Sequence, residues 1–185
     1  KMTSRENLFK KDVREQFEII EVIKYINKYK NSDFQILEKT EKPDYSLKNS
    51  NQENLYIELT SVYLNHHSVI DHKKKNREAK SIPYSEKNIQ IYLDRIIEAV
   101  VAKEKKASEE YDKKAVPLIL SIYLNEYIKI HIEEKKWLNW ILNNKPVFNK
   151  TSPFCNILLW PFSKDNFAMI IEKDKNKSLN IAKIT

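Results

Sequence analysis

The chain contains no glycine in its 185 residues. Loops that wrap phosphate groups depend on glycine, because only a residue without a side chain lets the backbone approach so closely. The sequence therefore excludes the glycine-rich loops of P-loop ATPases and GTPases and the dinucleotide fingerprint of NAD-binding enzymes. Tight turns must instead use asparagine, aspartate or lysine, which tolerate a positive φ less well than glycine does.

Length and composition indicate one globular domain spanning residues 1–185, since 41% of the residues are hydrophobic. The net charge of +7 favours a nucleic-acid partner, DNA more than RNA, although lysines spread evenly over a solvated surface explain it equally well. The single cysteine, Cys155, excludes an internal disulfide framework and suits a reducing cytoplasm. No apolar run approaches ~18 residues, so we expect no membrane span, and we expect no secretion signal.

Hydrophobic periodicity predicts a mixed α/β domain with a central β-sheet flanked by α-helices. The first helix is expected to bury Phe17, Ile20 and Ile26. The predicted elements, in chain order, are a helix over 5–30, strands over 34–37, 45–47 and 54–62, a helix over 89–111, a strand over 118–124, a helix over 131–143, and strands over 156–161 and 166–172.

Two carboxylates carry the chemistry that the sequence indicates. Asp44 follows Pro43 at the start of one predicted strand, and Glu58 lies in the middle of the next. If these strands pair, both carboxylates can project to one face, where their charges repel unless a cation lies between them. Oxygen ligands suit Mg²⁺ or Mn²⁺, which can activate water and stabilise phosphate oxygens during phosphodiester cleavage.

The segments EIIEVIKYI, KPDY and LYIELTSV, followed by a helix and a strand, resemble the PD-(D/E)XK nuclease superfamily. The resemblance implies a restriction-endonuclease-like core over about residues 13–124, with a C-terminal helix and strand extension over 125–185. It also implies Mg²⁺-dependent hydrolysis of DNA or RNA, with Glu21, Asp44, Glu58 and the carbonyl of Leu59 as metal ligands. Glu18 is the alternative to Glu21.

The sequence departs from the family pattern at Thr60, where the family has lysine. Threonine cannot supply the positive charge that orients the attacking water. In some branches of the family, a lysine on the following helix takes this role, and its long side chain can reach across. We expect Lys103, or secondly Lys106, to act in this way.

Two other functions remain open from the sequence. The first is a catalytically inactive nuclease-fold module that binds nucleic acid or protein. The second is a subunit of a defence or mobile-element system, in which the tryptophan-bearing C-terminal third could form a homodimer surface.

Other candidate residues have simpler interpretations. A zinc site at His66, His67, Asp71 and His72 matches no strong spacing, so a polar loop is the better interpretation. Cys155 is expected to be a small buried residue. The tryptophans are expected to anchor the core or an interface rather than to stack on bases; they are Trp137, Trp140 and Trp160.

Overall fold

The computed structural model describes residues 11–64, 85–111, 117–125, 129, 132–148, 153–162, 167–173 and 179–185. Its elements confirm the expected α/β class, with a mixed sheet flanked by helices. In chain order they are α2 (Lys11–Lys30), β1 (Gln35–Lys39), β2 (Tyr45–Lys48), β3 (Asn54–Val62), α4 (Glu86–Glu110), β4 (Leu118–Leu124), α5 (Glu134–Asn143), α6 (Lys145–Phe148), β5 (Phe154–Trp160), β6 (Ala168–Lys173) and β7 (Leu179–Ile184).

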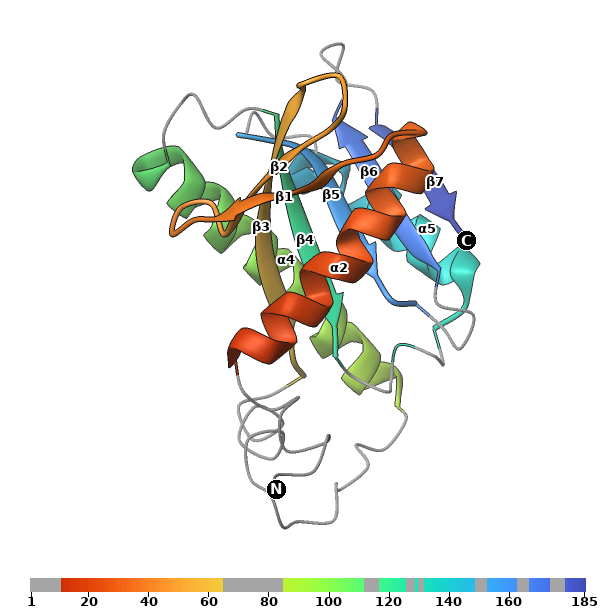
Figure 1. Ribbon diagram of the computed structural model, residues 1–185. Helices are drawn as coiled ribbons and strands as arrows, with labels where there is room; N and C mark the ends of the chain where they lie inside the picture. Colours follow the sequence, from red (N-terminus) through yellow and green to blue (C-terminus); the bar gives the residue numbers. More distant parts are fainter. Residues whose placement is uncertain are drawn as a thin grey trace, which may run out of the picture.

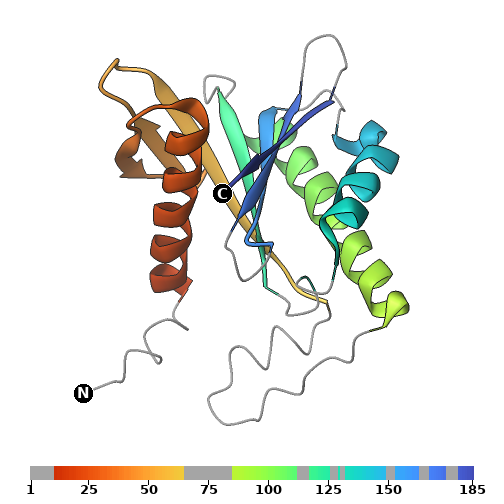
Figure 2. The same ribbon diagram turned by 90° about the vertical axis from the view of Figure 1, so that its right-hand side faces the viewer.

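The seven strands form one sheet in which spatial order follows chain order. Strands β3, β4 and β5 run parallel, and the remaining neighbours are antiparallel. Parallel neighbours need a crossover connection, and here α4 joins β3 to β4 while α5 and α6 join β4 to β5. These helices cover one face of the sheet, and α2 covers the other (Figures 1 and 2).

The C-terminal third continues the sheet rather than lying beside it. Leu120 in β4 pairs with Ile157 in β5, and β6 and β7 extend the same sheet further. Strand β7 was not among the predicted elements. Its sequence, LNIAKI, has exposed, half-buried and buried positions without strict alternation, so pairing with β6 rather than its own pattern defines it as a strand.

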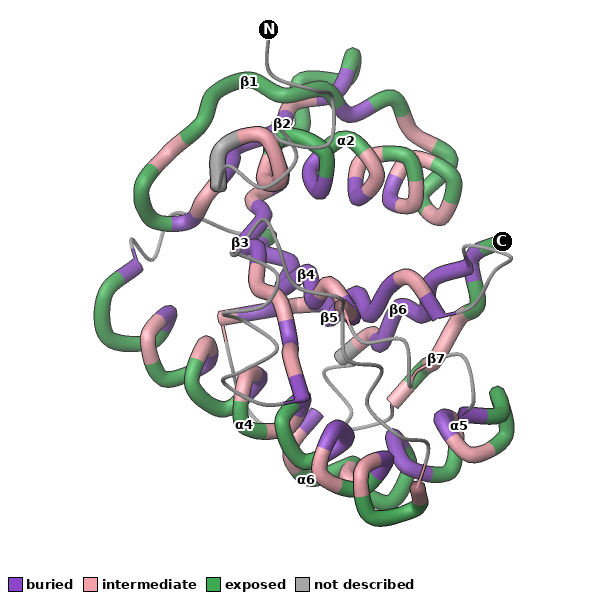
Figure 3. The backbone as a smooth tube through the Cα atoms, turned by 90° about the horizontal axis from the view of Figure 1, so that it is seen from below, coloured by how far each residue is buried: buried purple, intermediate pink, exposed green. Residues whose placement is uncertain are grey.

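Hydrophobic residues fill both spaces between the sheet and its helices (Figure 3). Strand β4 is buried on both faces, as its continuous apolar run predicts. The three tryptophans, at most 7% exposed, lie in the core as expected; they are Trp137, Trp140 and Trp160. Among the described residues, no helix is both long enough and apolar enough to cross a membrane.

Helix α2 faces the sheet with a different side from the one predicted. Phe17 and Ile20 are 45% and 51% exposed, so their expected burial is wrong, whereas that of Ile26 is correct. The buried positions also include a carboxylate, Glu18, which interrupts the apolar stripe. Reading the helix by its hydrophobic pattern assigns a glutamate such as Glu18 to the outer face. The predicted inward face of α2 is therefore rotated about the helix axis relative to the observed one.

Turns without glycine place other residues in the left-handed region. Asn31 ends α2 with φ 48°, and Gln52 lies in the β2–β3 hairpin with φ 65°. The predicted hairpin turn is present, since the Gln52 N–H donates to the carbonyl of Asn49 at 3.0 Å. Asparagine tolerates this conformation better than glutamine does, so Gln52 carries the larger backbone strain.

Replacing Gln52 with glycine is therefore expected to raise the free energy of unfolding by roughly 0.5–1 kcal/mol. Relief of the left-handed strain, about 1–2 kcal/mol, exceeds the entropy that glycine loses on folding. Urea denaturation measures the change. The matched control is Asn51→Gly, because Asn51 lies in the same turn without a positive φ and should lose stability. Equal effects of the two substitutions would contradict the prediction.

Candidate active site

The strand register brings Asp44 and Glu58 to adjacent positions. Tyr45 pairs with Ile57 in the antiparallel β2–β3 ladder, so the preceding residue, Asp44, lies opposite Glu58. The Asp44 Oδ2 atom accepts a hydrogen bond of 2.7 Å from the backbone N–H of Leu59. The β2–β3 ladder ends at Tyr45, and the next hydrogen bond to β3 is accepted by the Asp44 side chain. This hydrogen bond holds the Asp44 carboxylate against β3.

Glu58 points towards α4. Its neighbours Ile57 and Leu59 pack in the cluster beneath α2, and alternation along the strand turns Glu58 to the opposite face. There it is only 1% exposed. Its Oε1 atom lies 2.5 Å from Lys103 Nζ and 3.8 Å from Lys106 Nζ. The carboxylate therefore receives two cations from one helix.

The lysines reach Glu58 because of their phase on α4. Val100, Glu104 and Ala107 form the buried stripe of this part of the helix. Lys103 and Lys106 lie beside that stripe, with side chains 22% and 38% exposed, so their stems pack inward while their amino groups reach the strand. The expected approach of a helix lysine to the motif is present in the structure, and Lys103 is the closer of the two.

Tyr111, directly after α4, was missed by sequence reasoning, which treated it only as the end of a helix. It is 8% exposed, and its hydroxyl faces the Glu58 carboxylate. Burial, followed by the interaction with Glu58, raises the pKa of Tyr111. The approach does not complete a well-formed hydrogen bond, because both the Tyr111 hydroxyl and Glu58 Oε2 are buried without a partner among the described residues.

The two carboxylates influence each other. Burial raises the pKa of Asp44, and the adjacent Glu58 raises it further, while the Leu59 N–H and Lys103 act in the opposite direction. A raised pKa means that the folded protein resists a second negative charge beside Glu58. A cation placed between the two groups would remove that resistance.

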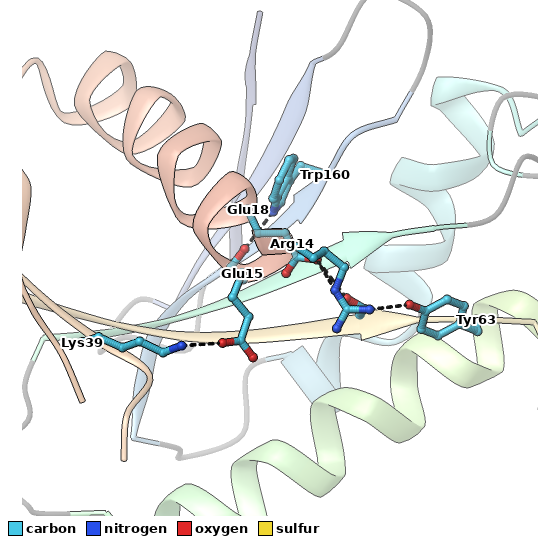
Figure 4. Close-up of polar contacts among 8 residues, drawn as sticks. Arg14, Glu15, Glu18, Lys39, Tyr63 and Trp160 are labelled. Atoms are coloured by element: carbon cyan, nitrogen blue, oxygen red, sulfur yellow. Dashed lines mark hydrogen bonds and ion pairs between the residues drawn. The ribbon is translucent and has the colours of Figure 1, made fainter. Parts of the chain in front are cut away.

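A second carboxylate network lies on the α2 side of the sheet (Figure 4). Glu18, 2% exposed, pairs with Arg14 Nε at 3.2 Å and accepts a 3.3 Å hydrogen bond from Ser61 Oγ. Arg14 also donates to the Tyr63 hydroxyl at 2.8 Å. Burial raises the pKa of Glu18 to about 7, Arg14 and Ser61 lower it, and Glu15 and Asp44 raise it.

Of the two upstream carboxylates considered from the sequence, Glu18 rather than the preferred Glu21 interacts electrostatically with Asp44. Glu21 pairs with Lys24 at 2.5 Å and acts electrostatically on Tyr25. Asp44 raises the pKa of Glu18, the alternative, and Glu15, three residues earlier on the same helix, raises the pKa of Asp44. The reason is the rotated face of α2, which turns Glu18 towards the sheet.

No group of three or more His, Cys, Asp or Glu side chains could hold a metal ion within the described residues. Glu18 meets Ser61 on the α2 side of β3, whereas Glu58 faces α4, and this separates them. Asp44, Glu58 and the Leu59 carbonyl still fit a magnesium ion, which proteins usually hold through one or two carboxylates and several waters. Oε2 of Glu58, which is buried and has no hydrogen-bond partner within the part of the chain that the structure describes, is an available ligand atom.

Other candidate features lie apart from this pair. A hollow of about 820 Å³ lies at the hairpin end of the sheet, lined by residues that include Tyr29, Lys30 and Glu172 but neither carboxylate of the pair. The Cys155 thiol donates to the Leu118 carbonyl at 3.3 Å, and burial raises its pKa, so it remains a neutral thiol. The histidine cluster at 66–72 lies outside the described residues.

Comparisons with family models, curated proteins and solved structures find no match for this chain. The resemblance to PD-(D/E)XK nucleases therefore depends on the sequence segments themselves. Functional interpretation depends on the geometry around Asp44, Glu58 and Lys103.

Proposed function

We propose that the protein is a metal-dependent nuclease of the PD-(D/E)XK type, with a restriction-endonuclease-like core, that hydrolyses phosphodiester bonds of DNA or RNA. The observation that carries this proposal is the Lys103 amino group on the buried Glu58 carboxylate, beside Asp44. A carboxylate pair and a lysine at one strand edge are the groups that the motif requires, with Lys103 supplying the charge that Thr60 lacks.

The proposed roles follow from the position of each side chain. Asp44, Glu58 and the Leu59 carbonyl would hold Mg²⁺ or Mn²⁺, which supplies an activated water and neutralises charge on the phosphate when bound. Lys103 pairs with the buried Glu58 carboxylate and lies where it can orient a water or donate to a phosphate oxygen. Lys106 adds a second donor on the same side.

Charge around the pair suits a polyanionic substrate. Lys42 lies near the end of α4, where it pairs with Glu110 at 2.9 Å, and Lys106 also acts on Glu110. Together with Lys103, these lysines place three cations near the carboxylates, in a chain of net charge +7. We favour DNA over RNA as the substrate.

The test is cleavage of plasmid DNA and of RNA in the presence of Mg²⁺ or Mn²⁺. The wild type is expected to cut at least one substrate, and Asp44→Ala and Glu58→Gln are expected to lose this activity, because each removes a ligand oxygen. Asp94→Ala is the matched control, since Asp94 is exposed on α4 and interacts with Gln90. Equal cleavage by the wild type and Asp44→Ala would overturn the assignment.

An inactive nucleic-acid-binding module on the same fold is the second candidate function. Two observations favour it: Thr60 replaces the motif lysine, and Lys103 and Lys106 both place positive charge on the Glu58 carboxylate. Calorimetric titration with Mn²⁺ separates the candidates. A binding isotherm that disappears in Glu58→Ala supports the nuclease, whereas nucleic-acid binding without any Mn²⁺ isotherm supports the module.

A further inference from the structure

Three buried oxygen atoms around the carboxylate pair have no hydrogen-bond partner among the residues that the structure describes: Glu58 Oε2, the Tyr111 hydroxyl and Ser46 Oγ. Ser46 pairs with Tyr56 in the β2–β3 ladder and therefore shares the sheet face of Glu58. Buried polar atoms are normally paired, and each exception calls for an explanation. These three buried oxygens therefore belong to residues at or beside the carboxylate pair.

Tyr111 is the residue on this face whose position is fixed from two sides. Its backbone N–H donates to the Ala107 carbonyl at 3.3 Å, which anchors it to the last turn of α4. The Lys106 amino group lies 5.6 Å from the centroid of its ring, within the range of a cation–π interaction. Its hydroxyl faces Glu58. The ring and the hydroxyl thus contact two different members of the site.

We propose that Tyr111 is a positioning residue of the nuclease site, whose hydroxyl orients the Glu58 carboxylate and whose ring holds Lys106 beside it. Lys103 contacts Oε1 of Glu58, and the Tyr111 hydroxyl interacts with the same carboxylate, so the two together would restrain its rotation. Tyr111 acts through Glu58 and Lys106 rather than on the substrate. The inference rests on the proposed nuclease function.

Two substitutions separate the two contacts of Tyr111. Tyr111→Phe removes the hydroxyl and keeps the ring, so Glu58 loses its restraint while Lys106 keeps its place. We expect Mn²⁺ affinity to fall by about 10–100-fold, the usual cost of removing a group that orients a metal ligand. We expect kcat to fall with it while KM for nucleic acid is unchanged. Tyr111→Leu also removes the ring, and KM should then rise because Lys106 is released.

The experiment compares the wild type, Tyr111→Phe, Tyr111→Leu and the control Tyr92→Phe, which removes another buried phenol from α4. Mn²⁺ calorimetry and steady-state cleavage are measured on each, with urea unfolding to show which variants are folded. Tyr92→Phe should match the wild type in Mn²⁺ affinity and kcat. Tyr111→Phe should differ from it in both.

The outcomes distinguish this inference from the function on which it rests. An active, Mn²⁺-binding wild type with an unchanged Tyr111→Phe variant overturns the positioning role alone. Equal losses in Tyr111→Phe and Tyr92→Phe also overturn it, because they would indicate a general cost of removing a buried hydroxyl. A wild type that neither binds Mn²⁺ nor cleaves nucleic acid overturns both the nuclease function and the role of Tyr111.

Discussion

Replacing Lys103 with methionine is expected to lower the free energy of unfolding at pH 7 by about 3 kcal/mol. Glu58 is 1% exposed, and Lys103 is its closest cation at 2.5 Å. Removing one partner of a buried ion pair leaves an uncompensated charge and usually costs about 3–5 kcal/mol. The lower end is expected here because Lys106, 3.8 Å from the same oxygen, remains. Urea denaturation measures the loss.

Two further variants define what that loss means. Lys105→Met makes the same chemical change at an exposed position of α4, and it should alter stability by no more than about 0.5 kcal/mol. Glu58→Gln, added to Lys103→Met, removes the unpaired charge and should restore part of the loss. If Lys103→Met is no less stable than Lys105→Met, the buried ion pair is not formed in solution, and the proposed role of Lys103 loses its basis.

The strands that frame the carboxylate pair could be predicted closely from the sequence. The bounds of β3 and β4 agree with the predicted 54–62 and 118–124. Alternation in the first and an uninterrupted apolar run in the second are local patterns that strand burial imposes directly. The same alternation allowed Asp44 and Glu58 to share one face, and the family resemblance directed attention to the lysines of the following helix, of which Lys103 contacts Glu58. Local periodicity therefore positioned the central part of the site.

Features that depend on contacts between distant segments could not be predicted. The inward face of α2 depends on a buried carboxylate, Glu18, whose burial is tolerated because Arg14 and Ser61 meet it there. Tyr111 joins the site only because α4 ends beside Glu58. Neither residue has a local pattern that distinguishes it from an exposed helix residue, so tertiary structure alone identifies them.

Glu18 provides the second large effect, because its pKa is raised from 4.5 to about 7 in the folded protein. The folded state therefore binds the proton more tightly than the unfolded state does, and burial is the main cause. The stability that this proton contributes is fully present below pH 4.5 and is lost as the pH rises through about 7. At about 1.4 kcal/mol for each pKa unit, the loss amounts to about 3 kcal/mol.

Glu18→Gln imitates the protonated acid at every pH, so its stability is not expected to fall as Glu18 deprotonates in the wild type. Its free energy of unfolding should gain about 3 kcal/mol relative to the wild type between about pH 4 and pH 8. Denaturation curves across this range measure the gain, and Glu21→Gln is the control, since Glu21 is a more exposed carboxylate of the same helix and also lies in an ion pair.

A difference between Glu18→Gln and the wild type that does not vary with pH would contradict the raised pKa. If Glu18→Gln instead loses stability relative to the wild type as the pH rises, the ion pair of Glu18 with Arg14 outweighs the cost of burying the charge. The answer bears on the candidate site, because Asp44 raises the pKa of Glu18. A neutral Glu18 leaves Asp44 and Glu58 as the acidic groups available to a cation, whereas an ionised Glu18 would add a third negative charge across β3.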